Sequence, residues 1–123
     1  MTDKLTQQEE DVMRVVWKIK EGNVKTFLEN MPDENRPPYT TLASTIKNLA
    51  KKGYLQSRLI GNMYWYTPAV KESDYKKKSL GDMVKNHFDN SYKELVTFFA
   101  RQKKISPQEL QEIVDLIEKK KKQ

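Results

Sequence analysis

The segment from residue 37 to residue 55, PPYTTLASTIKNLAKKGYL, has the pattern of a helix with a definite start and a definite stop. Two prolines precede it, where a missing N–H is harmless, and Gly53 follows it, where a left-handed residue commonly ends a helix. Leu42, Ile46 and Leu49 lie within about 60° of one another at 100° per residue. The sequence therefore predicts a helix over about 38–52 that buries this apolar stripe in a core.

The opposite face of this helix carries hydroxyl, amide and lysine side chains and no carboxylate. The stretch from residue 35 to residue 71 contains six Lys or Arg and no Asp or Glu, although the chain has 17 acidic residues and a net charge of +6. Phosphate groups repel carboxylates and attract Lys and Arg, so this stretch is a candidate nucleic-acid face. The predicted DNA contacts are Thr40, Thr41, Ser44, Lys47, Asn48, Lys51, Arg58 and Asn62.

Two further helices are predicted before this segment. Thr6 and Glu9 match a capping box at the start of a helix that ends near residue 20. Asn23 is placed to cap a short second helix over about 24–31. Residues 32–38 read as a polar turn that leads into the third helix.

A β-hairpin is predicted after the third helix. Gly61 and Asn62 both tolerate positive φ and predict a tight turn between two short strands, the second of which Pro68 ends. Three helices followed by a two-stranded ribbon is the order of a winged helix–turn–helix domain. We therefore expect a mainly α fold with a small β-wing and a winged-helix domain over residues 1–70.

Residues 71–123 are expected to form a second domain of three helices. Capping boxes at Ser91 and Ser106 open the last two helices. The first of the three is expected to bury Leu80, Met83, Val84 and Phe88. Apolar residues lie on two sides of the helices, which about fifty residues cannot cover alone, so a homodimer is expected. The predicted dimerisation residues are Leu80, Val84, Phe88, Leu95, Phe98, Phe99, Ile113, Leu116 and Ile117.

Several classes of protein are excluded by what the sequence lacks. It has no Ser/His/Asp set, no paired catalytic carboxylates and no Gly-rich phosphate loop, so neither an enzyme nor a cofactor site is expected. His87, the only histidine, cannot make the usual zinc site without cysteine. No apolar run approaches the roughly 18 residues that span a bilayer, and the N-terminus has no signal-peptide core. A cytoplasmic protein without a membrane partner is expected.

Two alternatives to DNA binding stay open at this point. In the first alternative, the polar face of helix 38–52 is an ordinary solvated surface, although such surfaces usually mix Glu with Lys. In the second the winged helix is a protein–protein interaction module, which favours an apolar or acid-bearing face that this helix does not have. Arg58 and Asn62 are either DNA contacts or simple turn chemistry.

The sequence resembles the penicillinase-repressor family of bacterial transcription regulators (BlaI/MecI), with the copper-responsive CopY repressors as cousins. The resemblance is carried by LTQQEEDVMRVVW at 5–17, YTTLASTIKNLAKKGYL at 39–55, GNMYWYTP at 61–68 and SYKELVTFFARQKKISPQELQEI at 91–113. These segments span nearly the whole chain in the family's order.

The resemblance implies a homodimeric repressor that occupies a palindromic operator. It places the third helix in the major groove, with Thr40, Thr41, Ser44 and Lys47 toward the bases. Lys51, Arg58 and Asn62 would lie near phosphates. Ala43 stands where some relatives carry a long basic side chain, so the base preference is expected to differ.

Two departures from the family limit what the resemblance implies about regulation. The chain has no cysteine, which argues against the metal response of CopY-type repressors. A sensor protease inactivates the β-lactam-linked members by cutting an Asn–Phe bond. The matching pair here is Phe98–Phe99, which makes that bond the candidate cleavage point and a sensor protease a candidate partner. The missing Asn argues against both.

Overall fold

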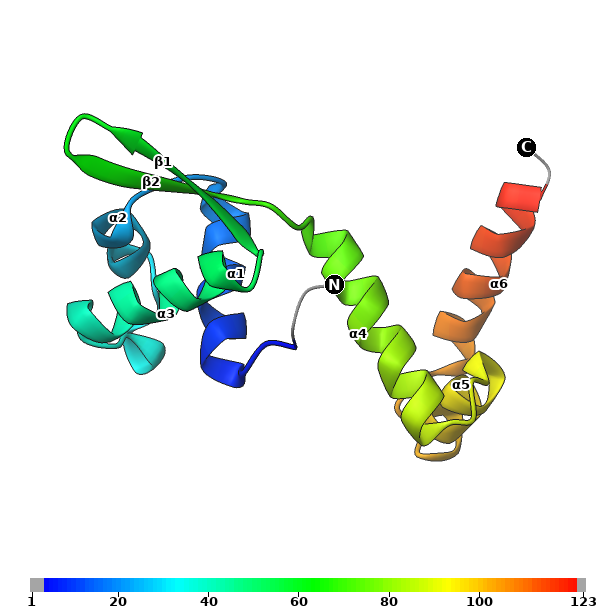
Figure 1. Cartoon of the computed structure of the whole chain (residues 1–123). Helices are drawn as coiled ribbons and strands as arrows, with labels where there is room; N and C mark the ends of the chain where they lie inside the picture. The colour runs from blue at the N-terminus through cyan, green and yellow to red at the C-terminus, as the bar shows by residue number, and fades with distance from the viewer. Residues whose placement is uncertain (1–3, 122–123) are drawn as a thin grey trace. The chain divides into compact units, whose positions relative to one another are not determined.

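The computed structural model describes residues 4–121, apart from the side chains of Asn35, Lys120 and Lys121 (Figure 1). The described part divides into two compact units, with the division between Lys76 and Lys77. The elements are α1 (Gln7–Ile19), α2 (Val24–Glu29), the 3₁₀ turn η1 (Asp33–Asn35), α3 (Tyr39–Lys51), β1 (Leu55–Ile60), β2 (Met63–Pro68), α4 (Glu72–His87), α5 (Tyr92–Arg101) and α6 (Pro107–Lys121).

Side chains cap α1 and α2 as the sequence predicted. Thr6 Oγ1 accepts from the Glu9 N–H at 3.1 Å, and Glu9 Oε1 accepts from the Thr6 N–H at 2.9 Å, so the capping box is complete. Asn23 Oδ1 accepts from the Thr26 N–H at 2.8 Å and starts α2. The expected turn before α3 differs in one respect, because it contains the 3₁₀ turn η1.

Gly53 ends α3 in the left-handed conformation, with φ at 87°. Its N–H donates to the Ala50 carbonyl at 3.1 Å, and the Tyr54 N–H donates to the Leu49 carbonyl at 2.9 Å. These two bonds make a Schellman motif, which folds the chain back over the last turn of the helix. Tyr54 is consequently buried, and the chain enters β1 directly.

The wing is an antiparallel hairpin in which Ile60 pairs with Met63, so Gly61 and Asn62 form a two-residue turn. Only Gly61 has positive φ, at 62°, so the expectation that Asn62 shares this conformation is wrong. One positive residue at the first turn position suits a II′-type turn. In Figure 1 the hairpin runs alongside the helices of the first unit and its turn projects beyond them.

A backbone bridge that the sequence did not suggest connects β2 to the loop after α1. The Gly22 N–H donates to the Tyr66 carbonyl at 3.1 Å, and the Tyr66 N–H donates to the Gly22 carbonyl at 2.8 Å. A Cβ at Gly22 would lie 3.1 Å from side-chain atoms of Thr26 and Phe27. The absence of a side chain therefore lets the loop approach the strand.

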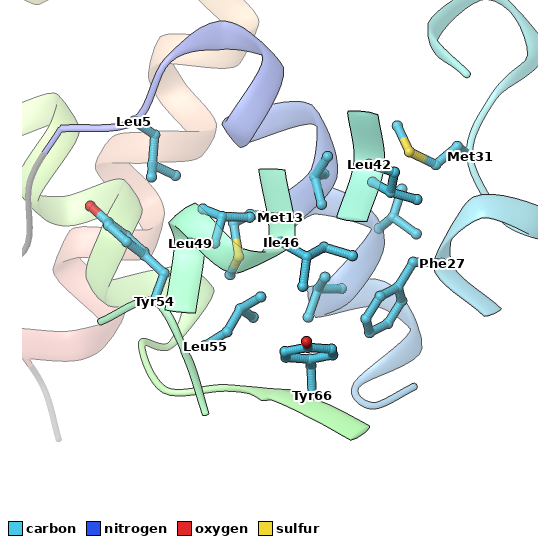
Figure 2. Close-up of a cluster of buried hydrophobic side chains, with 13 residues drawn as sticks. Leu5, Met13, Phe27, Met31, Leu42, Ile46, Leu49, Tyr54, Leu55 and Tyr66 are labelled. Atoms are coloured by element: carbon cyan, nitrogen blue, oxygen red, sulfur yellow. The ribbon is translucent and has the colours of Figure 1, made fainter. Parts of the chain in front are cut away.

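One hydrophobic core joins the three helices and the hairpin (Figure 2). The predicted stripe of α3 lies at its centre, since Leu42, Ile46 and Leu49 are fully buried. Burying side chains of this size contributes about 1.5–3 kcal/mol each, and this burial fixes the rotation of α3 about its axis. The other members of the core are Leu5, Val12, Met13, Val15, Val16, Phe27, Met31, Tyr54, Leu55 and Tyr66.

The second unit has a much smaller core. Val84 is its buried residue in the described part of the chain, at 1% exposed, while Met83 and Phe88 are half-buried. Leu80 is 51% exposed, so the expectation that a single chain buries it is wrong. The aromatic rings of Phe88 and Phe98 meet edge to face, with their centroids 5.7 Å apart.

The two predicted capping boxes in the second unit differ in the structure. Ser106 and Glu109 make both reciprocal bonds, at 2.9 and 3.0 Å. Ser91 makes only half of its box: its Oγ accepts from the Glu94 N–H at 3.1 Å, but its own N–H donates to the Phe88 carbonyl instead. The turn between α4 and α5 therefore competes with the box for one donor.

Candidate nucleic-acid interface

The outward face of α3 is presented as the sequence predicted. All six predicted contacts on this helix are exposed: Thr40, Thr41, Ser44, Lys47, Asn48 and Lys51. The rotation of the helix is not free, because its opposite face is fully buried. Thr45 marks the border: it is buried, and its Oγ1 donates to the Thr41 carbonyl at 3.0 Å.

The cations on this face are available to an external anion. Lys47, Lys51 and Arg58 make no salt bridge with any acidic residue in the described part of the chain. Pro38, at the N-cap of α3, supplies no side-chain acceptor to the first amides of the helix. Free amides at a helix N-terminus add partial positive charge beside the hydroxyl-bearing first turn.

Lys52 belongs to the same basic stretch but not to this face. Its Nζ lies 2.6 Å from Glu9 Oε1 and 3.3 Å from the Lys4 carbonyl. Burial raises the pKa of Glu9, but hydrogen bonds from Lys52 and Thr6 and the charge of Lys52 outweigh it and lower that pKa overall. Lys52 therefore stabilises the first unit. The sequence count of six basic residues between positions 35 and 71 overstated the positive charge available to DNA, because it included Lys52.

The hairpin residues lie on two faces of the wing. Arg58 pairs with Trp65 on the face away from Tyr66, and it lines a shallow hollow together with Glu21. Asn62 lies exposed at the turn. The nearby carboxylate of Glu21 reduces the positive potential that Arg58 presents, an influence that the sequence did not reveal.

The apolar tip of the wing was not predicted as a surface. Leu59 and Tyr64 form a cross-strand pair on the same face as buried Tyr66, yet both are more than half exposed. Burial, with smaller effects from Tyr64 and Tyr39, raises the pKa of Tyr66. Exposed Tyr39 lies at the first position of α3. The inner face of β2 continues beyond the edge of the core, where its side chains are exposed.

The predicted dimerisation residues fall into two groups. Val84 is already buried within one chain, and Phe88 and Leu95 are half-buried, so these three mainly hold the second unit together. The remaining residues leave an uncovered apolar surface, to which the structure adds Tyr92, Val96 and Val114. The predicted residues that are exposed are Leu80, Phe98, Phe99, Ile113, Leu116 and Ile117.

The Phe98–Phe99 bond lies in the last turn of α5. The Phe98 carbonyl accepts from the Gln102 N–H, and the Phe99 carbonyl accepts from the Lys104 N–H at 3.0 Å. A protease binds its substrate in an extended form, so cutting here would require the end of α5 to unwind. This geometry adds to the missing Asn as an argument against cleavage.

Two other features, a cluster of metal-binding side chains and a membrane-spanning helix, are absent from the described residues. No three His, Cys, Asp or Glu residues between positions 4 and 121 are grouped to hold a metal ion, and His87 lies exposed at the end of α4. No described helix is long and apolar enough to cross a membrane.

Known proteins resemble this chain over most of its length. The family model described as "Penicillinase repressor" matches residues 5–119. The methicillin resistance regulatory protein MecI of Staphylococcus aureus (strain N315) is 24% identical over 119 residues, which is 97% of each chain. The solved DNA-binding domain of the repressor BlaI is 28% identical, with a TM-score of 0.53 over 61% of this chain and 94% of that chain.

A second solved structure has DNA bound. It is the monomeric form of Bacillus licheniformis BlaI in complex with the blaP half-operator. It is 28% identical, with a TM-score of 0.52 over 61% of this chain and 92% of that chain. The winged helix–turn–helix fold predicted from the sequence is confirmed by these similarities.

Proposed function

The chain belongs to the penicillinase repressor family, and from that premise we propose that it is a homodimeric transcriptional repressor that binds a palindromic operator through α3 and the wing. The family is one of transcriptional repressors and not of enzymes. The observation that carries the proposal is the outward face of α3, which is open to solvent, free of carboxylates and held in one rotation by the core.

One winged-helix unit would contact one half-operator. BlaI, which is similar to this chain, has been solved in its monomeric form with a half-operator. In this chain Thr40, Thr41, Ser44 and Lys47 reach the base edges, because their short or flexible side chains let α3 enter the major groove closely. Lys51, Asn48 and the first amides of α3 contact phosphates, which fix the register on the duplex.

The second unit would supply the dimer. The exposed apolar residues of α5 and α6 form a surface that water-facing helices rarely carry, and a second copy is the occupant that gives a palindromic reader its two-fold symmetry. Linking two half-site contacts makes the second one intramolecular, which adds affinity without new contacts.

The wing would contribute less to DNA binding than α3. Asn62 lies exposed at the turn and would approach a phosphate next to the half-site. Arg58 would assist, although the carboxylate of Glu21, which lines the same hollow, offsets part of the positive potential there. Phe98–Phe99 matches the family's cleavage position only at its second residue, and its place in the hydrogen-bonded last turn of α5 supports regulation by a route other than a sensor protease.

A protein–protein interaction module is the alternative function. It would need an apolar or acidic outward face on α3, and the residues there carry hydroxyl, amide and basic side chains. The test is to select genomic fragments that the purified protein retains, and then to titrate a fluorescent copy of the best fragment by anisotropy. Tight binding to one palindromic sequence supports the repressor. Equal, weak binding to all duplexes would overturn it.

A further inference from the structure

The first turn of α4 is fastened to the first unit by an aromatic cluster. The Tyr75 hydroxyl donates to Glu10 Oε2 at 2.5 Å, which joins α4 to the first half of α1. The Tyr75 ring lies 5.5 Å from the Trp17 ring and 5.9 Å from the Tyr54 ring, measured between centroids. Tyr75 therefore contacts both α1 and the turn that ends α3.

Two further bonds hold this cluster in place. Trp17 Nε1 donates to the Val70 carbonyl at 2.9 Å, which fixes the short connection between β2 and α4. Arg14 Nη2 lies 3.1 Å from Glu10 Oε1 and leaves the other carboxylate oxygen of Glu10 for Tyr75. Burial and the bond to Glu10 also raise the pKa of Tyr75, so its hydroxyl remains a donor in alkaline solution where an ordinary tyrosine would ionise. We call Trp17, Tyr54, Tyr75 and Glu10 the aromatic anchor.

The anchor ends where the first unit ends. The two units divide between Lys76 and Lys77, immediately after Tyr75 and inside α4. The next residues of the helix, Lys77, Lys78, Ser79 and Leu80, are all exposed. Their support comes from the backbone of the helix and a surface pair between Lys78 and Asp82 at 3.0 Å. The first turn of α4 is therefore held by side-chain contacts, whereas the next turn, which contains Ser79 and leads to Gly81, is exposed.

We propose that Tyr75 is a positioning residue, which fastens α4 to the winged-helix unit so that the dimer presents its two α3 helices at one spacing. The inference rests on the proposed function, since spacing matters only in a dimer that reads two half-sites. None of the anchor residues is among the proposed DNA contacts. Their effect on operator binding would be entirely through geometry.

The physical reason lies in how a linker transmits position. A flexible linker gives two half-site readers a high effective concentration but tolerates many spacings. A continuous helix whose first turn is held in place restrains the direction in which the winged-helix unit is presented. Binding to half-sites at any other separation then requires the helix or its anchor to distort, which costs free energy. Loosening the anchor should remove this cost, and the dimer should then lose its preference for one half-site separation. Each winged-helix unit should still bind its half-site.

The first test compares palindromes that differ only in the number of base pairs between half-sites. For the wild-type chain, affinity should fall by about tenfold or more when two base pairs are added or removed, because the avidity gain of about 10² is partly lost. Tyr75→Ala should lower this discrimination to about threefold or less, with affinity for a single half-site unchanged. Tyr75→Phe, which keeps the ring and loses the bond to Glu10, should lie between the two.

Ser79→Ala is the control, because it removes a hydroxyl from an exposed residue of the same helix that lies outside both the anchor and the proposed dimer surface. It should keep the wild-type discrimination. If Tyr75→Ala also keeps it, or if Tyr75→Ala weakens half-site and palindrome binding by the same factor, then Tyr75 only supports the fold and the proposal is wrong.

A second measurement needs no DNA. The chain has no cysteine, so Glu29→Cys at exposed Glu29 places one spin label on each subunit. Electron–electron distance measurement should find a narrow distribution between the two labels in the wild-type background and a distinctly broader one with Tyr75→Ala. Equal widths, or no dimer, would overturn the positioning role. A protein that binds no operator but shows the broadening would contradict the proposed function and not the anchor.

Discussion

Glu9 Oε1 lies 2.6 Å from Lys52 Nζ while it also accepts the Thr6 N–H, so one carboxylate both caps α1 and pairs with the end of α3. The Glu9 side chain is 8% exposed and the Lys52 side chain 23%, so the pair is largely shielded from water. The ion pair therefore joins the first turn of one core helix to the last turn of another.

The first prediction concerns acid stability. The pKa of Glu9 is lowered in the folded chain, so its contribution to stability is complete above the unfolded value near 4.5 and is lost as the pH falls through the folded value. Glu9→Gln should destabilise the first unit by about 1–3 kcal/mol at pH 7, with a smaller difference below pH 4.5. Urea unfolding at several pH values measures this, and Asp33→Asn at a 97% exposed carboxylate is the control. A difference that does not change with pH would contradict the ion-pair role.

The second prediction concerns salt. Two recognition helices and two wings should neutralise about six to ten phosphates, which gives a slope of log affinity against log salt of about −5 to −9. An anisotropy titration at four salt concentrations measures the slope. A value near zero would remove phosphate contact from the proposed function.

The third prediction separates reading of bases from contact with phosphates. Ser44→Leu should weaken operator binding by about 1–3 kcal/mol per half-site and leave non-specific binding nearly unchanged. Lys51→Ala should weaken both and reduce the salt slope by about one for each phosphate that is no longer neutralised. Lys25→Ala, at a lysine on α2 outside the proposed interface, is the control for charge alone. Identical behaviour of the Ser44 and Lys51 variants would mean that the face is assigned wrongly.

The fourth prediction concerns the dimer. Leu116 is 62% exposed in one chain, so Leu116→Asp should fold normally but would bury a charge beside its symmetry mate. We expect a shift toward monomer in sedimentation velocity and a loss of operator affinity on the order of 10². Lys119→Gln makes the same change in charge at another exposed position of α6 and should remain dimeric. A dimeric Leu116→Asp with full affinity would place the interface elsewhere.

The fifth prediction compares two glycines that both have room for a side chain. At Gly81, inside α4, a Cβ would meet only the Tyr92 hydroxyl at 3.8 Å, so Gly81→Ala should stabilise the helix by about 0.5–1 kcal/mol. At Gly61 nothing lies within 4 Å, but φ is +62°, so Gly61→Ala should destabilise the hairpin by about 1–2 kcal/mol. Hydrogen exchange of α4 and of the hairpin measures both. Changes of the same sign would show that the backbone conformation is not what distinguishes them.

The local signals in the sequence determined most of the elements and the face of α3. The Thr6–Glu9 box, the Asn23 cap and the glycine at the end of α3 each act over a few residues, and the structure has all of them. The apolar period of α3 oriented its stripe because a helix has a fixed rotation per residue. The hairpin turn could also be located from the sequence, because its two residues are neighbours in the chain and their conformational preferences act locally.

Only the tertiary structure decided which distant groups meet. Lys52 and Glu9 are separated by 43 positions, Tyr75 and Glu10 by 65, and no periodicity connects such residues. Lys52 therefore seemed to belong to the surface charge, and Tyr75 gave no sign that the first turn of α4 packs on the first unit. The edge of the core likewise decided that Tyr66 is buried while Tyr64 is exposed. Sequence patterns specify which face of an element is apolar, but whether that face is covered depends on how far the neighbouring elements extend.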